Sequence, residues 1–329
     1  MNGYIKIPTP EDLDIISDIK FSPVENHLLV SSWDNQILLY DTDYYETCRL
    51  MNKFQSTTPT LCMTFAKNNS AYVGTLEGGI FEIDFENDKL LNMNWVHLND
   101  LDSGINNINT IDNLVISTSF SKKFQGTDYR QSTPIFSNVL SHKILAMDTN
   151  DNEVILALSD RIIERYDKRD WSKPLESRES PFDLQINDLK TFDEGFAVSS
   201  IDGRVGMEFF NPDTSRFVFR CHRTTDKLTN TQIAYPVNSL SFNDNLLYTS
   251  GSDGIVNIWN WQNKKKTSSL NQLKYSNNEI QSIVKSDING TKDLLAIATS
   301  DDGYKTTKDL NYSSSLPQYP SNVYLYRLK

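Results

Sequence analysis

A short turn motif recurs seven times along this chain of 329 residues, at nearly even spacing. Its central position moves from Trp33 in the first copy to Ser300 in the last, so the mean interval is (300 − 33)/6, or 44.5 residues. A repeat of about 40 to 45 residues is what four short antiparallel strands and their turns occupy in one blade of a β-propeller. The seven turns are 31–35, 74–78, 118–121, 158–161, 199–203, 250–254 and 298–302.

Short runs of β-branched and aromatic residues flank these turns. In the sixth repeat, Val237–Phe242 and Leu246–Thr249 precede the Asp253-Gly254 turn, and Ile255–Trp259 follows it. Such runs favour strands, and Asp-Gly suits a tight hairpin because glycine tolerates positive φ. The sequence therefore predicts an all-β chain that folds over residues 1–329 as a single seven-bladed β-propeller domain.

The two ends of the chain are expected to pair. The seventh repeat ends with Val323–Arg327, which is only its third strand. The segment Gly3–Ile7 precedes the first strand of the first repeat, Ile16–Phe21, and belongs to no other repeat. We expect this N-terminal segment to supply the outer strand of blade 7, because that pairing closes the ring and covers an exposed edge. Removal of residues 1–8 should then destabilise the whole ring.

Charge, hydrophobic runs and cysteine spacing argue against several classes of partner and cofactor. A formal net charge of −11 argues against nucleic acid as a partner, since phosphate binding needs a cationic surface. No apolar run approaches the roughly 18 residues that span a bilayer, so we expect no membrane partner. The N-terminus lacks a secretory pattern. The three cysteines, Cys48, Cys62 and Cys221, have no metal-ligand spacing, which predicts a reducing intracellular compartment and no cofactor.

Basic residues concentrate after the fifth turn. Arg204 follows Asp202-Gly203, and Phe217–Cys221 reads as the outer strand d of the same blade. In a propeller, b–c turns and d–a connections emerge on one face, so these cations are expected to converge on one rim, where guanidinium groups suit a phosphorylated side chain. The alternative is a solvated surface, or pairing with local carboxylates such as Asp202 and Glu208. The cations between 216 and 227 are Arg216, Arg220, His222, Arg223 and Lys227.

Two other features have competing interpretations. Trp33 lies at the tip of a b–c turn, where it is either a docking anchor for a partner or part of the channel wall. Lys264–Lys266 is expected to be a solvated connection between strands c and d on the opposite face.

Signatures of catalysis are weak. Cys221 and His222 are adjacent in what reads as a strand, which points their side chains to opposite faces and opposes a nucleophile–base pair. The sequence has no phosphate-binding glycine loop and no Gly-x-Ser-x-Gly motif. A binding scaffold is therefore favoured over an enzyme. A metal in the channel, or clustered carboxylates with raised pKa values, would instead indicate an intracellular propeller enzyme.

Several ordered motifs resemble the Bub-family WD-repeat proteins of the spindle-assembly checkpoint, in their fungal version. The specific pair is Asp202-Gly203-Arg204-Val205 followed by Phe217-Val218-Phe219-Arg220-Cys221-His222-Arg223, within a matching block at about 185–265. Turns such as Ser32-Trp33-Asp34 extend the resemblance over most of the chain. The chain departs from the family pattern at Phe120, which lacks an indole donor, at Asn187, and in an irregular stretch from Lys122 to Ser132.

The resemblance implies a non-enzymatic adaptor that acts in the nucleus, at the kinetochore. It implies binding of phosphorylated Met-Glu-Leu-Thr motifs in a kinetochore scaffold, and recruitment of a checkpoint kinase or its kinase-less relative through a short peptide motif. The related messenger RNA export adaptor, which docks a nucleoporin peptide, is the nearest alternative, although the acidic charge disfavours it. By position, the phosphothreonine would be held by Arg204 and Arg220, and the docking surface would contain Trp33, Phe120, Arg223 and Tyr235.

Overall fold

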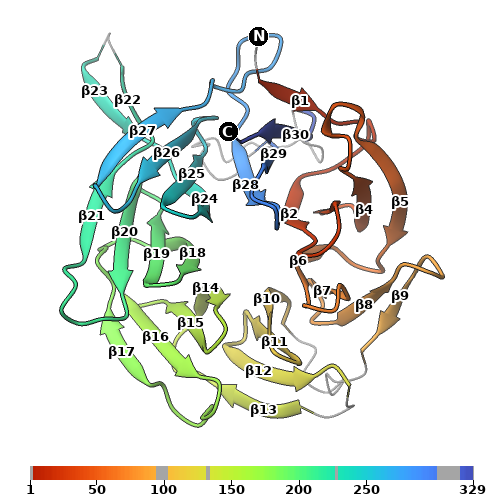
Figure 1. Cartoon of the computed structure of the whole chain (residues 1–329), viewed down its shortest axis with the longest axis vertical. Coiled ribbons are helices and arrows are strands. Elements are labelled where there is room, and N and C mark those ends of the chain that lie inside the picture. Colours follow the sequence, from red (N-terminus) through yellow and green to blue (C-terminus); the bar gives the residue numbers. More distant parts are fainter. Residues whose placement is uncertain (1–2, 94–102, 131–133, 227–228, 302–318, 329) are drawn as a thin grey trace.

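The computed structural model describes residues 3–93, 103–130, 134–226, 229–301 and 319–328. These residues form seven antiparallel sheets of four strands each, arranged as blades around a central opening (Figure 1). The predicted all-β, seven-bladed propeller is confirmed. In the part of the chain described, the helical structure is one short 3-10 turn, η1 (Tyr45–Thr47), and no helix is long and apolar enough to cross a membrane.

Blades 1 to 6 each use four consecutive strands, from the innermost strand a to the outermost strand d. Blade 1 contains β2 (Ile16–Phe21), β3 (His27–Ser32), β4 (Gln36–Asp41) and β5 (Arg49–Gln55); blade 2 contains β6 (Thr60–Phe65), β7 (Ala71–Thr75), β8 (Ile80–Asp84) and β9 (Lys89–Asn92). Blade 3 contains β10 (Ile105–Ile111), β11 (Leu114–Ser119), β12 (Lys123–Asp128) and β13 (Pro134–Val139); blade 4 contains β14 (Ile144–Thr149), β15 (Glu153–Leu158), β16 (Ile162–Asp167) and β17 (Glu176–Glu179). Blade 5 contains β18 (Ile186–Phe192), β19 (Gly195–Ser200), β20 (Arg204–Phe209) and β21 (Phe217–Arg220); blade 6 contains β24 (Val237–Asn243), β25 (Leu246–Gly251), β26 (Val256–Asn260) and β27 (Lys265–Ser269).

Blade 7 joins the two ends of the chain. Its strands are β28 (Ile283–Ile288), β29 (Leu294–Thr299), β30 (Asn322–Arg327) and β1 (Tyr4–Lys6), with β1 as the outermost strand. Tyr4 lies opposite Tyr326 in the antiparallel register, and the Ile7 N–H donates to the Val323 carbonyl at 3.0 Å. The expected closure of the ring by the N-terminal segment is therefore confirmed.

The hydrophobic core is divided among the seven junctions between neighbouring blades. At the junction of blades 1 and 2, for example, Leu29 and Ile37 pack with Met63 and Val73. Equivalent clusters occupy the other six junctions among the described residues. Each blade is therefore stabilised mainly by its two neighbours, because a single twisted sheet buries little apolar surface by itself.

Aspartates of the innermost strands also link neighbouring blades. A carboxylate oxygen of Asp18 accepts the Met63 N–H of blade 2 at 2.9 Å, and Asp287 of blade 7 accepts the Phe21 N–H of blade 1 at 2.8 Å. Because each bond crosses the junction between two blades, these carboxylates fix the spacing between neighbouring blades. Two further aspartates bind backbone N–H groups of blades 5 and 6 in the same way, namely Asp148 and Asp188.

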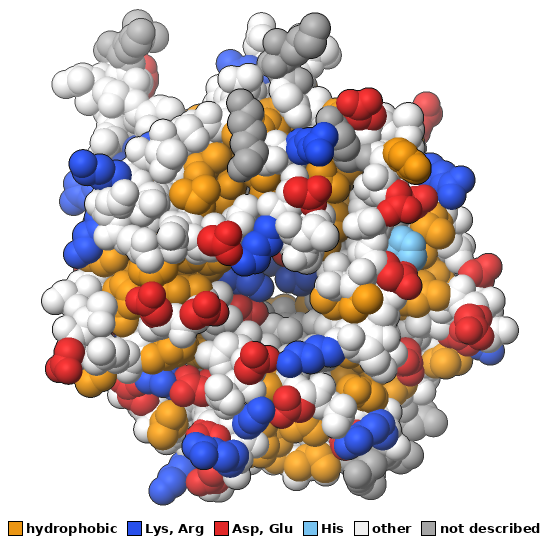
Figure 2. Space-filling view, in the orientation of Figure 1, with side chains coloured by type: hydrophobic (Ala, Val, Ile, Leu, Met, Phe, Trp, Pro, Cys, Tyr) orange, Lys and Arg blue, Asp and Glu red, His pale blue; other side chains and the backbone are white. Residues whose placement is uncertain are grey.

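Lysines accompany these aspartates, and Figure 2 shows basic side chains around the central opening. Burial favours the neutral form of Lys20 and by itself lowers its pKa. The nearby carboxylates of Asp18 and Asp287 outweigh this effect, so the Lys20 pKa is raised. Burial also raises the pKa values of Asp188 and Asp287, despite the nearby lysines. Carboxylates with raised pKa values are thus present in the channel. Each accepts a hydrogen bond from a backbone N–H of the next blade, which gives it a structural role.

Two local predictions were right only in part. Lys122 takes a φ of 71° to close the b–c turn and β12 follows it directly, although the register of β12 and β13 shifts between Gly126 and Thr127. The three consecutive lysines are exposed, as expected, but only Lys264 lies in the c–d turn, with a φ of 57°, whereas Lys265 and Lys266 begin β27. The part of the first stretch at 131–132 lies outside the described residues, as does position 302 of the seventh turn.

The connection between blades 5 and 6 is a hairpin that the sequence analysis did not anticipate. Strands β22 (Arg223–Asp226) and β23 (Thr231–Ala234) form a separate two-stranded sheet. The hairpin projects beyond the ring, next to β27 (Figure 1). It begins directly after Arg220 and His222, so its position bears on the candidate site.

Candidate functional site

The b–c turn of blade 5 places Arg204 at one rim of the propeller. Ser200 donates a hydrogen bond to the Asp202 carboxylate at 2.7 Å, and Gly203 takes a φ of 72°, so the turn reverses tightly before β20 begins. A side chain at Gly203 would also clash, since its Cβ would lie 2.6 Å from the Cys221 carbonyl oxygen. The Asp-Gly pair is therefore required by both conformation and space.

Arg204 and Arg220 lie directly opposite each other on β20 and β21. Directly opposed residues of an antiparallel pair have their Cβ atoms about 4.5–5.5 Å apart, so two like charges in this position repel each other unless an anion joins them. Arg204 has a partial partner, because its Nε lies 2.9 Å from an Asp202 carboxylate oxygen. Arg220 is exposed and has no ion pair with any described residue.

Arg223 completes the group of guanidinium side chains. Its Nη2 donates to the Asp202 backbone carbonyl at 2.7 Å, and its Nη1 donates to the Gln232 side chain at 3.3 Å. Tyr235 is half-buried at the base of the hairpin, where its N–H donates to the His222 carbonyl at 2.9 Å. The structure therefore places Arg204, Arg220, Arg223 and Tyr235 near one another.

A buried chain of hydrogen bonds holds this segment in place. His222 contacts Asp253 through Nδ1 at 2.8 Å and Thr249 through Nε2 at 2.9 Å, and the Trp259 indole donates to the same Thr249 hydroxyl at 3.1 Å. The sequence analysis placed His222 within a strand, which is wrong because β21 ends at Arg220 and His222 has a φ of 47°. The network anchors the backbone between Arg220 and Arg223 to blade 6, and it gives His222 a structural role.

The arginine group is suited to bind an anion. The Asp202 carboxylate lies near two of the three guanidinium groups, those of Arg204 and Arg223. The Nε atoms of Arg204 and Arg223 are buried, and neither donates a well-aligned hydrogen bond. The Arg204 Nε nevertheless lies near the Asp202 carboxylate. Unsatisfied guanidinium donors can form charge-assisted, often bidentate bonds with phosphate or carboxylate oxygens.

Other predicted cations do not join this group. Arg216 lies at the opposite end of β21, and its Nη1 is 3.9 Å from Glu208, so the alternative of local pairing holds for that residue. Asn187, one of the departures noted in the sequence, donates to the Val237 carbonyl at 2.9 Å and links blades 5 and 6. Lys227 lies outside the described residues.

Trp33 and Phe120 lie on the same face as the arginines. Both occupy tips of b–c turns, with 40% and 56% of their surfaces exposed, so Trp33 is available for contact and is not buried in the channel wall. Each backbone N–H donates to the carbonyl just before strand a of its own blade, Ile15 for Trp33 and Gly104 for Phe120. The two side chains are therefore presented in equivalent ways on blades 1 and 3.

Two further apolar residues share this position and were missed by the sequence analysis. Leu76 of blade 2 and Ile201 of blade 5 are 38% and 40% exposed, and their N–H groups bond to the Pro59 and Gln185 carbonyls. An alignment of the seven turns would have revealed both residues. We call the set of four exposed apolar turn tips, Trp33, Leu76, Phe120 and Ile201, the turn-tip surface.

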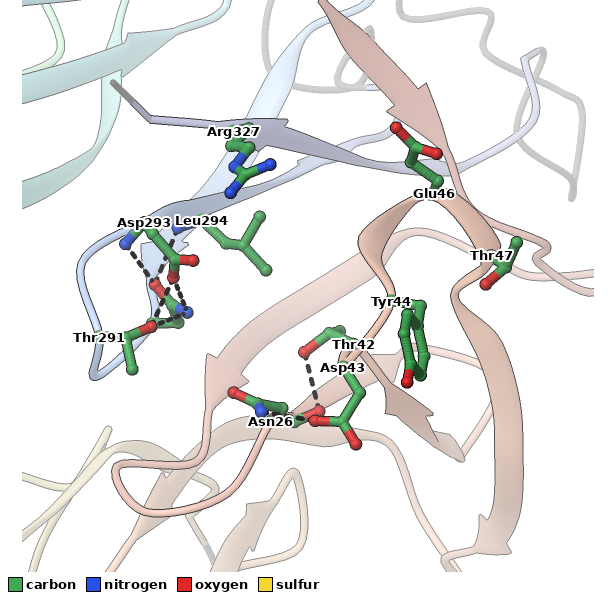
Figure 3. A pocket seen from close by; sticks show the side chains of 11 residues that line it. Asn26, Thr42, Asp43, Tyr44, Glu46, Thr47, Thr291, Asp293, Leu294 and Arg327 are labelled. Carbon is green, nitrogen blue, oxygen red and sulfur yellow. Dashed lines mark hydrogen bonds between the residues drawn. The ribbon is translucent and has the colours of Figure 1, made fainter.

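The opposite face carries a different kind of pocket. A cavity of about 530 Å³ between blades 1 and 7 is lined by acidic side chains, Arg327 and the exposed Tyr44 (Figure 3). Asp43 accepts a hydrogen bond from Asn26 at 2.5 Å. Within the described residues, no group of three or more His, Cys, Asp or Glu side chains is arranged to hold a metal ion. The acidic residues that line the cavity are Asp43, Glu46 and Asp293.

Comparison with known proteins defines the family. A family profile described as WD domain, G-beta repeat matches residues 9–41 and 216–260. The spindle assembly checkpoint protein bub3 of Schizosaccharomyces pombe is 33% identical, over 87% of this chain and 88% of its own length. The chain belongs to the Bub3 family. Mitotic checkpoint proteins of the same name occur among its relatives in Arabidopsis thaliana, at 29% identity over 77% of this chain and 76% of the relative, and in Dictyostelium discoideum, at 28% over 87% and 86%.

Solved structures agree with the propeller fold of this Bub3-family chain. The structure of U3-55K superimposes with a TM-score of 0.76, covering 99% of this chain and 98% of the other at 11% identity. The WD40 propeller domain of Doa1 gives a TM-score of 0.72, covering 100% and 98% at 13% identity. At such identities the likeness concerns the fold alone. The Bub3 relatives support a WD-repeat protein of the mitotic checkpoint.

Proposed function

We propose that this Bub3-family chain is a phosphorylation-gated recruiter at the mitotic kinetochore. In this proposal Arg204 and Arg220 bind the phosphothreonine of Met-Glu-Leu-Thr motifs in a kinetochore scaffold, and the turn-tip surface docks a short motif of a checkpoint kinase or its kinase-less relative. The main support is the direct opposition of Arg204 and Arg220 across β20 and β21, with Arg220 unpaired among the described residues.

The charge of the phosphate explains the gating. A threonine hydroxyl has no net charge, whereas phosphothreonine carries about −1.5 to −2 charges at pH 7 and has three strong acceptor oxygens. Such a dianion between Arg204 and Arg220 relieves their mutual repulsion and accepts bonds from both guanidinium groups. Asp202 limits the attraction of the site for weaker anions, because its carboxylate already neutralises part of the Arg204 charge.

Docking of the second partner uses apolar contact. Trp33, Leu76, Phe120 and Ile201 lie at the same structural position on four blades, so a peptide that crosses this face can cover several of them. Large aromatic side chains commonly contribute most of the binding free energy at such interfaces. Phe120 supplies apolar area but no N–H donor, so its contribution in this chain should depend on packing alone.

The test measures binding of a Met-Glu-Leu-Thr peptide, with and without threonine phosphate, by fluorescence anisotropy. Arg204→Ala and Arg220→Ala should each weaken binding of the phosphorylated peptide by about 10- to 100-fold, the effect of losing one charge-assisted contact of ~1.5–3 kcal/mol. Arg216→Ala is the matched control, because Arg216 lies at the far end of β21 and should leave binding within about twofold.

The outcomes separate phosphate recognition from other causes. A loss confined to the phosphorylated peptide, in variants whose thermal unfolding is unchanged, supports the proposal. Equal affinity for both peptides, or no binding when a co-purified partner motif is supplied, would refute it and favour the messenger RNA export alternative.

A further inference from the structure

The hairpin β22–β23 is a sheet with two open edges. In the described residues it pairs with no blade, and it forms a two-stranded sheet of its own. An isolated hairpin is marginally stable in water, and its unpaired backbone groups are a ready template for another strand. The hairpin is nevertheless fixed at its base by the His222 network with Asp253 and Thr249.

The register shows which backbone groups point outward. The Tyr235 N–H donates to the His222 carbonyl, so these two residues form a hydrogen-bonded pair. Hydrogen-bonded and non-hydrogen-bonded pairs alternate along an antiparallel ladder, so Thr224 pairs inward with Ile233. The outward backbone groups are therefore those of Arg223 and Thr225 on the β22 edge, and of Gln232 and Ala234 on the β23 edge.

The β22 edge begins close to the arginine group. Arg223 follows Arg220 by three residues, so their Cα atoms lie within about 11 Å. Arg223 itself contributes a guanidinium group to the site through its bond to the Asp202 carbonyl. Thr225, the next outward residue, is exposed. An extended segment whose anionic residue contacts Arg220 can therefore continue along β22.

We propose that the β22 edge binds the backbone of the phosphorylated target segment as an added antiparallel or parallel strand. The arginines supply charge complementarity to one phosphorylated residue, and the outward N–H and C=O groups of Arg223 and Thr225 bind alternate peptide units beyond it. This inference rests on the proposed function and extends it. It predicts that an unfolded, extended target is recognised largely through its main chain, so residues beyond the phosphothreonine can vary.

Proline substitutions on the two edges provide a matched test. Thr225→Pro removes an outward N–H from β22, and Ala234→Pro removes one from β23, while neither residue forms an inward ladder bond. Loss of one interface hydrogen bond should weaken binding of the phosphorylated Met-Glu-Leu-Thr peptide by roughly 3- to 10-fold for Thr225→Pro. Ala234→Pro and Thr225→Ala should bind within about twofold of the unsubstituted chain.

A set of peptides gives a second, independent measurement. Phosphopeptides that carry a single backbone N-methyl group at successive positions should lose affinity at every second position on one side of the phosphothreonine, because alternate N–H groups face β22. Phosphate-dependent binding that is equally affected by both proline variants, or by neither, would overturn edge binding while leaving the proposed function intact. Failure of the unsubstituted chain to bind the phosphopeptide would overturn both.

Discussion

Ile7 is the buried residue through which the N-terminal segment closes the ring, so Ile7→Ala tests how far closure stabilises the whole propeller. Ile7 is only 1% exposed and packs in the cluster that joins blades 7 and 1, with Leu28, Val323 and Leu325 among its members. Truncation of a buried isoleucine to alanine typically costs about 2–5 kcal/mol. We expect the substitution to lower the free energy of unfolding by this amount.

The expected change in melting temperature follows from the chain length. An unfolding entropy of about 2.1 cal/mol/K per residue gives roughly 0.7 kcal/mol/K for the 329 residues. A loss of about 2–5 kcal/mol should then lower Tm by about 3–7 °C, if the ring unfolds as one unit. Calorimetry and circular dichroism of the same samples should give coincident transitions.

Lys6→Ala is the control, because Lys6 is exposed in the same strand. It should change Tm by less than about 1 °C, since exposed substitutions usually have effects within ±0.5 kcal/mol. A chain that lacks residues 1–8 should lose more stability than Ile7→Ala, because it also loses the β1 ladder and the contact of the Tyr4 and Tyr326 rings at 5.5 Å. A separate early transition, with the remaining blades melting at the original Tm, would refute closure as a global constraint.

Three further predictions concern other parts of the molecule. Arg178→Leu should lower the free energy of unfolding at pH 7 by about 3–5 kcal/mol, because it leaves the buried Glu208 carboxylate without the guanidinium 3.0 Å away. Burial already raises the Glu208 pKa. Urea titrations should therefore show this loss shrinking as the pH falls toward 4.5 and the carboxyl group protonates. Burial raises the pKa values of Cys48 and Cys221 to about 12 and also raises that of Cys62, so a thiol reagent at pH 8 should label the chain only after denaturation; rapid labelling of the folded chain would contradict this. Trp33→Ala should weaken binding of the checkpoint-kinase motif by at least about 10-fold in titration calorimetry, whereas Val24→Ala, an exposed apolar residue on the opposite face, should have no effect.

The sequence predicted the arrangement of the blades because the repeat constrains it strongly. Turn spacing and alternating apolar runs were sufficient to predict the propeller, and the unmatched Gly3–Ile7 segment predicted the closure. The convergence of Arg204 and Arg220 followed from the topology. Their direct opposition did not, because the register of β20 and β21 depends on the conformation of the connection at 210–216.

The sequence did not predict features that depend on local backbone conformation or on contacts between distant parts of the chain. The hairpin β22–β23 is built from polar, threonine-rich segments without an Asn-Gly or Asp-Gly turn, so its sequence resembles that of a loop. The burial of Glu208 depends on Arg178, which comes from the outer strand of the preceding blade. His222 was misplaced because β21 ends at Arg220 and His222 takes a positive φ, a conformation that is uncommon for residues other than glycine.

The closure of blade 7 also sets an order of events during synthesis. The strand Tyr4–Lys6 leaves the ribosome about 320 residues before its partner Asn322–Arg327 is made. At roughly 5–20 residues per second, the first strand waits about 15–65 s for its partner. During that time blades 1 to 6 can form in succession while an apolar face of blade 1 stays uncovered. The nascent chain therefore passes through an open ring with an exposed seam, which is the state that chaperones would need to protect.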